Sequence, residues 1–169
     1  MGIFDIFGKT SRRPTLQEIL YENAPSNRIT IPREQMLNLA NQRAAQDIRI
    51  INESKTIIQT TVKPNVFFSR LELFKEKIDD LALLSPYIKI KGPSPYALKQ
   101  AFDKDKETMI NNFVDRCRKA TEEKISTLKT QKAKDNQCKK FVEMFDKYKY
   151  SMSEISYKRV EMIAKAMSQ

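Results

Sequence analysis

The sequence predicts an all-α protein, an antiparallel bundle of three long helices closed by short capping helices. Apolar residues recur every three or four positions along most of the 169 residues, which is the spacing of one buried helix face. Only three glycines interrupt the chain, and the seven prolines stand between the periodic stretches, where each can end one helix or begin the next. Short connections between long helices favour antiparallel neighbours.

Two helices are predicted in the first third of the chain. Thr15 opens a short helix, because Thr15-x-x-Glu18 has the spacing of a capping box, in which each side chain binds the other residue's backbone N–H. Residues 24–27 (APSN) end it. A long helix is predicted over residues 32–62, and Lys55 interrupts its apolar stripe, where the lysine stem could lie along the core.

The helix predicted over residues 67–84 has the most regular pattern in the chain. Its apolar residues alternate steps of four and three, which is typical of helices packed in bundles: Phe67, Leu71, Phe74, Ile78 and Leu81. After it, Ser94 is expected to cap a third long helix that starts at Pro95 and runs to about Leu128.

Two shorter helices are predicted to close the bundle. The polar stretch 130–137 is interpreted as a bend or connection, and a helix follows it over residues 141–148. Ser151-x-x-Glu154 has capping-box spacing and is expected to open the last helix. The apolar stripe of that helix consists of Ile155, Val160, Ile163 and Met167.

The remaining segments are shorter. Residues 28–31 and 87–91 alternate in hydropathy, which fits either a minimal two-stranded ribbon at one end of the bundle or extended loop. Residues 1–14 are predicted to be a short apolar N-terminal segment with a basic linker, and residues 15–169 a single helical domain.

The residue types on which many enzymes depend are missing. The chain has no histidine, which excludes Ser-His-Asp and Cys-His catalysis and nearly every zinc site. Its three glycines form no cluster, whereas phosphate-binding loops need several. Asp103 and Glu107 share a helix face, but the lysines between them favour surface ion pairs over a metal site. We therefore expect a protein that is not an enzyme and that uses no metal or other cofactor.

Cysteine use and hydropathy bear on the compartment. Cys117 and Cys138 fall on helical core positions, which favours two buried thiols and leaves a disulfide as the alternative. No stretch approaches the length of a membrane-spanning helix, and Asp5 and Gly8 interrupt the N-terminal apolar stretch, so no secretory signal is predicted. We expect a cytoplasmic protein, with peripheral attachment to the inner membrane face as the alternative.

Positive charge is concentrated in the last third of the chain. Residues 116–169 hold 14 Lys/Arg and 7 Asp/Glu, and therefore +7 of the total net charge of +10. Such a surface attracts a phosphate polymer by counterion release, without reading bases. The scarcity of arginine and of interleaved aromatic residues favours the alternative of a merely solvated face. The candidate phosphate contacts are Arg116, Arg118, Lys119, Lys129, Lys132, Lys134, Lys139 and Lys140.

The N-terminus offers a second candidate contact surface. Its first seven residues hold four large apolar side chains: Ile3, Phe4, Ile6 and Phe7. Lysine and arginine residues follow them. A short apolar peptide followed by cations is the pattern of a weak anchor on anionic lipid. Docking on the helical body or on a partner protein is the alternative.

Several short stretches carry a likeness to other proteins. They are residues 60–70 (TTVKPNVFFSR), 91–95 (KGPSP) and 112–116 (NFVDR), together with the start MGIFD. They resemble a helical domain of Gram-positive bacterial and phage proteins, over roughly residues 50–150. The resemblance contains no catalytic motif, so it implies a bacterial or phage origin and no particular activity.

A regular helical pattern without catalytic equipment favours a non-catalytic interaction protein, an adaptor or inhibitor whose surface binds another macromolecule, foremost a protein. Long apolar stripes also suit self-association, so a homodimer is an alternative to a monomer. The first alternative function is sequence-independent nucleic-acid binding by the basic surface of residues 116–140. The second is peripheral membrane association through residues 1–9.

Overall fold

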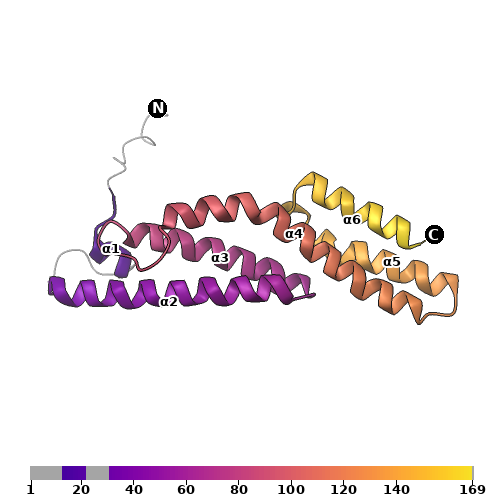
Figure 1. The fold of residues 1–169 in the computed structure, drawn as a ribbon, viewed down its shortest axis with the longest axis horizontal. Coiled ribbons are helices and arrows are strands. Elements are labelled where there is room, and N and C mark those ends of the chain that lie inside the picture. The colour runs from indigo at the N-terminus through magenta and orange to yellow at the C-terminus, as the bar shows by residue number, and fades with distance from the viewer. Residues whose placement is uncertain (1–12, 22–30, 169) are drawn as a thin grey trace, which may run out of the picture.

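A computed structural model of the protein describes residues 13–21 and 31–168. Every regular element within these residues is a helix, so the predicted all-α class is confirmed (Figure 1). In chain order the elements are α1 (Leu16–Leu20), α2 (Arg33–Thr60), α3 (Pro64–Leu84), α4 (Pro95–Ser126), α5 (Gln131–Asp146), the 3₁₀ helix η1 (Lys149–Ser151) and α6 (Glu154–Met167).

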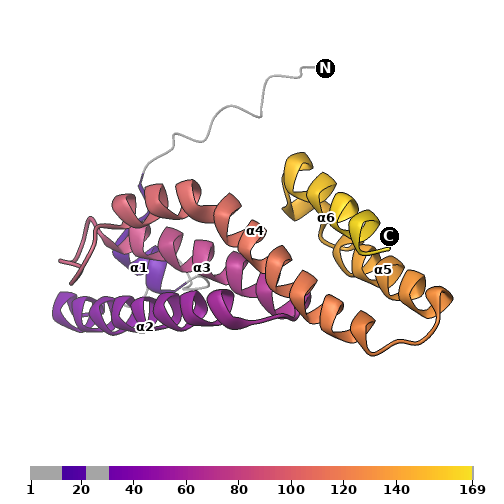
Figure 2. The same ribbon diagram turned by 45° about the vertical axis from the view of Figure 1, so that its right-hand side comes forward.

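The three predicted long helices are α2, α3 and α4; α3 runs antiparallel to both of its neighbours, and α2 and α4 run in the same direction (Figure 1). The first half of α4 packs on the α2–α3 hairpin, and its second half continues beyond the hairpin to pack with α5 and α6 (Figure 2). We call α1, α2, α3 and the first half of α4 the N-terminal unit. The second half of α4 with α5, η1 and α6 is the C-terminal unit. The two last helices are therefore not mere caps, because they build a second three-helix layer.

The hairpin of α2 and α3 is packed with a regular seven-residue spacing. The buried residues of α2 alternate steps of four and three, as the apolar residues of α3 do, but they are smaller: Ala40, Ala44, Asp47, Ile51, Ser54 and Ile58. Small residues on one helix let large side chains of an antiparallel neighbour fit between them. Ser54, not Lys55, continues the stripe, since Ser54 is fully buried and Lys55 is exposed.

Stacked rings connect the two units. Phe67 at the start of α3 stacks on Phe113 in the middle of α4, with ring centres 4.1 Å apart. Phe113 also meets Phe145 of α5 edge to face at 5.8 Å, a favourable arrangement for buried rings. We call this group the aromatic cluster. Its members come from α3, α4, α5 and the residue before η1: Phe67, Phe68, Phe113, Phe141, Phe145 and Tyr148.

Two predicted helix starts are confirmed in detail. The backbone N–H of Thr15 donates to Glu18 Oε2 at 2.7 Å, and the Glu18 N–H donates to Thr15 Oγ1 at 3.3 Å, which completes the capping box. Ser94 accepts from the backbone N–H of Ala97 at 3.2 Å, and Pro95 is the first residue of α4.

The ribbon alternative is wrong for its second half, because residues 87–91 form a turn and loop. The backbone N–H groups of Tyr87 and Ile88 donate to the Leu84 carbonyl and continue the end of α3 as a turn. The alternation in hydropathy has another cause, since Ile88 and Ile90 reach the core from this loop and are partly buried. Residues 28–30 lie outside the described part of the chain.

Two predicted helix starts in the C-terminal unit are wrong. The stretch 130–137 is not a connection, because Thr130 caps α5 and the helix begins at once. Its polar sequence reflects exposure, since Cys138 is the first buried residue of α5. At α6 the capping residue is Ser153, which accepts from the Ser156 backbone N–H, and Ser151 instead ends η1.

Candidate functional site

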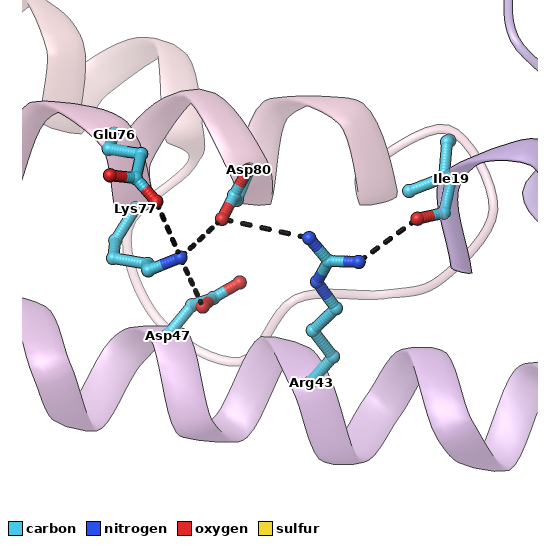
Figure 3. A network of polar contacts seen from close by, with 6 residues as sticks. All are labelled: Ile19, Arg43, Asp47, Glu76, Lys77 and Asp80. Carbon is cyan, nitrogen blue, oxygen red and sulfur yellow. Dashed lines mark hydrogen bonds and ion pairs between the residues drawn. The ribbon is translucent and has the colours of Figure 1, made fainter. Parts of the chain in front are cut away.

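A network of charged side chains lies between α2 and α3 (Figure 3). Lys77 of α3 is at its centre. The Nζ atom of Lys77 is 2.6 Å from Asp80 Oδ2, 3.1 Å from Glu76 Oε1 and 3.8 Å from Asp47 Oδ1 on α2. Two of these three carboxylates are largely removed from water: the side chain of Asp80 is 18 % exposed and that of Asp47 is 4 % exposed.

Arg43 of α2 extends the network to α1. One terminal nitrogen of its guanidinium is 3.8 Å from Asp80 Oδ2, and the other donates to the Ile19 carbonyl oxygen at 3.0 Å (Figure 3). Ile19 stands near the end of α1, where helical carbonyls lack partners within the helix. Arg43 therefore fastens α1 to the hairpin.

The electrostatics of this network are those of a structural ion pair. Burial raises the pKa of the Asp47 carboxyl above its ordinary value, although the nearby Lys77 lowers it. The pKa of Lys77 is raised as well, chiefly because its ammonium donates to Asp80. A lysine that acts as a nucleophile or base needs a lowered pKa, so Lys77 is an unsuitable catalytic group. A buried ion pair in a helix seam instead fixes the register of the two helices.

A second polar group fastens α6 to α4. The Ser153 hydroxyl donates to Glu107 Oε1, and the buried Ser156 hydroxyl lies within hydrogen-bond distance of the same oxygen and of Asn111 Oδ1. Since hydroxyl donors favour the charged carboxylate, first Ser153 and then Ser156 lower the pKa of Glu107. The predicted surface role of Glu107 is therefore wrong. The sequence shows that a serine stands at the start of α6, but it does not show that Ser153 meets Glu107, which lies 46 residues earlier.

Both arginines among the predicted phosphate contacts have partners within the fold. The half-buried Arg116 donates to the carbonyl oxygens of Ile58 and Thr61 at the end of α2, and burial lowers its pKa. Arg118 is also half-buried, and its Nε atom is 3.9 Å from Glu122 Oε1. The Arg116 guanidinium is thus committed to helix packing, whereas the only polar contact of Arg118 with a described residue is this long one within α4.

The lysines among the predicted phosphate contacts are divided between α4, the loop that follows it, which holds Lys129, and α5. Lys119 lies exposed on α4, and Lys134 is half-buried. Four more, joined by Lys147 at the end of α5, are exposed and form no ion pair with any described residue. Positions 132, 139 and 140 share one side of α5, because seven residues complete about two helical turns. We call the following residues the lysine face of α5: Lys129, Lys132, Lys139, Lys140 and Lys147.

The outer side of α6 carries apolar residues that the sequence pattern assigned in part to the core. Ile155 is 80 % exposed and Met162, one heptad further, is 72 % exposed. The prediction for Ile155 is therefore wrong: α6 buries the opposite side, which includes Val160 and Ala164. We call the following residues the outer face of α6: Ile155, Lys158, Met162 and Lys165.

The apolar surface of α6 continues toward α4. A shallow cavity of about 130 Å³ lies between the two helices, and its lining mixes apolar side chains with one ion pair: Arg118, Glu122, Ile163, Ala166 and Met167. A larger cleft of about 330 Å³ lies between α2 and α4 in the N-terminal unit, where Lys55, Asp105 and Arg116 surround a floor of Ile58 and Met109.

The other predicted sites give less. Ile3, Phe4, Ile6 and Phe7 lie outside the described residues, so their role as a membrane or partner contact stays a prediction. Both cysteines are free and buried, and burial raises the pKa of the Cys117 thiol to about 12.

The described part of the chain holds neither a cluster of metal ligands nor a membrane-spanning helix. Residues 13–21 and 31–168 contain no group of three or more acidic or cysteine side chains placed to hold a metal ion. Of the helices formed by these residues, none combines the length and the apolar composition required to cross a bilayer.

Comparison with known proteins gives no relative from which a function could be carried over. No protein-family model, no curated protein and no solved structure matches this chain. The resemblance to a Gram-positive bacterial and phage helical domain therefore stays a prediction.

Proposed function

We propose that this protein is a non-catalytic interaction protein that binds another protein through the outer face of α6. The observation that carries the proposal is the exposure of Ile155 and Met162, one heptad apart on the same side of α6. Apolar residues with this spacing are those that helices bury against another helix. Scattered apolar residues are normal on a surface, but an aligned pair on a helix is a typical contact stripe.

The surroundings of this pair support the proposal. The shallow cavity between α4 and α6 lies beside the outer face and adds the apolar side chains of Ile163, Ala166 and Met167. The helix that presents the face is held firmly, because Arg159 of α6 forms an ion pair of 2.8 Å with Asp115 of α4. A surface on a well-anchored helix needs little ordering when a partner binds.

Affinity capture from the native host, followed by mass spectrometry, tests the proposal. Three forms of the full chain are compared after nuclease treatment: wild type, Ile155→Glu/Met162→Glu, and the control Tyr96→Glu. Tyr96 is 71 % exposed on α4 in the N-terminal unit, so the control changes an exposed apolar residue elsewhere. We expect a protein that wild type and control recover equally and that the double variant loses. Equal recovery by all three forms would contradict the proposal.

The lysine face of α5 supports a second candidate function, sequence-independent binding of a phosphate polymer. Its lysines point to solvent and have no carboxylate partner among the described residues, so they are free to displace counterions from a polyanion. The prediction is retention on DNA or RNA that collapses between low and physiological salt.

A matched pair of triple variants tests this second candidate. The changes Lys132→Gln, Lys139→Gln and Lys140→Gln remove three charges from the lysine face. The control removes three exposed charges from the N-terminal unit instead: Lys89→Gln, Lys91→Gln and Lys104→Gln. Weaker binding and a smaller salt slope for the first variant alone are expected. Equal loss in both variants would show a general effect of net charge, and the lysine face would then have no special role.

A further inference from the structure

The outer face of α6 alternates apolar and cationic side chains. In order it reads Ile155, Lys158, Met162 and Lys165, with steps of three, four and three. These are the positions that a second helix laid along α6 would contact. The ammonium of Lys158 has a partner beside the face, Glu154, and Lys165 forms no ion pair with any described residue.

A second copy of α6 is a poor occupant of this face. Two parallel copies would place lysine against lysine, because like positions of the seam meet. Two antiparallel copies would place each lysine against Ile155 or Met162 of the other copy, since unlike positions meet. Neither arrangement places a carboxylate of the other copy between the two helices, so Lys165, which forms no ion pair with any described residue, would be buried without a partner, and that is strongly unfavourable.

A phosphate polymer is also a poor occupant. It could neutralise Lys158 and Lys165, but it offers no apolar surface to cover Ile155 and Met162. A ligand that presents apolar groups and negative charge in alternation at helical spacing would match both kinds of side chain on this face.

We infer that the occupant is an acidic amphipathic helix of another protein, an inference that rests on the proposed function. Its apolar side chains would cover Ile155 and Met162, and its Asp or Glu residues would pair with Lys158 and Lys165. The adjoining cavity, which Ile163 and Met167 help to line, receives the edge of this helix. This is the mode in which an amphipathic helix lays its apolar side into a groove, with charges that select the partner.

Two designed helical peptides test the inference by fluorescence anisotropy with the full chain. Both carry leucine at the positions that meet Ile155 and Met162. One carries glutamate, and the other lysine, at the positions that meet Lys158 and Lys165. We expect the glutamate peptide to bind at least about tenfold more tightly at low salt, a difference of about 1.4 kcal/mol. The variant Lys158→Glu/Lys165→Glu should reverse the preference, and Ile155→Glu/Met162→Glu should bind neither peptide.

The matched control is Lys89→Glu/Lys104→Glu, which changes two exposed lysines of the N-terminal unit and should keep the preference for the glutamate peptide. Circular dichroism checks that each variant is folded. Equal binding of both peptides, no binding of the glutamate peptide, or a dimer in light scattering that Ile155→Glu/Met162→Glu disrupts would each overturn the inference. If host capture still depends on Ile155 and Met162, the inference alone fails; if that dependence is absent as well, the proposed function fails too.

Discussion

In the N-terminal unit, α2 buries every residue of its four–three stripe between Ala40 and Ile58, even where that residue is Asp47 or Ser54. In the C-terminal unit, α6 does the reverse and turns Ile155 and Met162 to solvent. Along its stripe α2 buries polar groups that are unfavourable in a core, and along its outer face α6 exposes apolar groups that are unfavourable in water. Polar groups in a seam specify how two helices fit together, whereas apolar groups on a surface provide contact area for a partner. Under the proposed function, α2 and α3 serve the fold, whereas α6 presents the surface for a partner.

The two units meet at the aromatic cluster, so a change in this cluster is expected to lower the free energy of unfolding the most. Phe113 is fully buried against Phe67 and Phe145. We expect Phe113→Ala to lower the free energy of unfolding by about 4 kcal/mol, because a buried ring is replaced by a cavity. Urea denaturation followed by circular dichroism measures the loss. One shared transition at lower urea is expected, and an unchanged midpoint would contradict a common aromatic core.

Variants of the charged network test how much it stabilises the N-terminal unit. The variant Lys77→Met leaves the carboxylates of Asp47 and Asp80 without the ammonium between them, and should lower the free energy of unfolding by about 3 kcal/mol. The double variant Asp47→Leu/Lys77→Met removes the unpaired buried charge and should recover most of that loss. Both values come from urea denaturation at neutral pH. A double variant that is less stable than Lys77→Met would mean that Asp47 stabilises the hairpin by other contacts.

A variant of Glu107, which binds the serines at the start of α6, tests how much these hydrogen bonds stabilise the C-terminal unit. The lowered pKa of Glu107 means that the folded state favours its carboxylate, so this contribution to stability is present above the ordinary pKa of 4.5 and is lost as pH falls below it. We expect Glu107→Gln to lower stability by about 1 kcal/mol at neutral pH, because the site is only half-buried. The difference from wild type should shrink as the pH falls below 4.5. A difference that does not change with pH would contradict the charged hydrogen bonds.

The smallest effect is expected on the outer face of α6. Because Ile155 and Met162 contribute little to the core, Ile155→Ser/Met162→Ser should change the free energy of unfolding by less than about 0.5 kcal/mol. The control Val160→Ser on the buried side of α6 should lower it far more. Thermal unfolding compares the three proteins. A large loss for the outer pair would show that these residues stabilise the fold and would remove the contrast between the units.

The sequence predicted the features that depend on neighbours along the chain. The helix spacing, the Thr15 capping box and the Ser94 start follow from residues three or four positions apart, where local geometry decides. The charged network was not predicted, because Asp47 and Lys77 meet only when the hairpin closes. Arg116 was assigned to phosphate for the same reason, since its carbonyl partners lie 55 and 58 residues away. The exposure of Ile155 depends on which side of α6 meets α4 and α5, and apolar spacing alone does not determine that.

The aromatic cluster has a consequence for folding during synthesis. The α2–α3 hairpin can close its charged network as soon as Leu84 has left the ribosome, since every member of that network is already made. Phe67 and Phe68 lie beside the turn of the hairpin, and their rings are covered only when Phe113, and afterwards Phe145 and Tyr148, have been made. A nascent chain that stops within α4 therefore displays phenylalanine to the surrounding water. Exposed apolar rings of this kind favour aggregation or chaperone binding, and they are exposed until α5 and Tyr148 have been made.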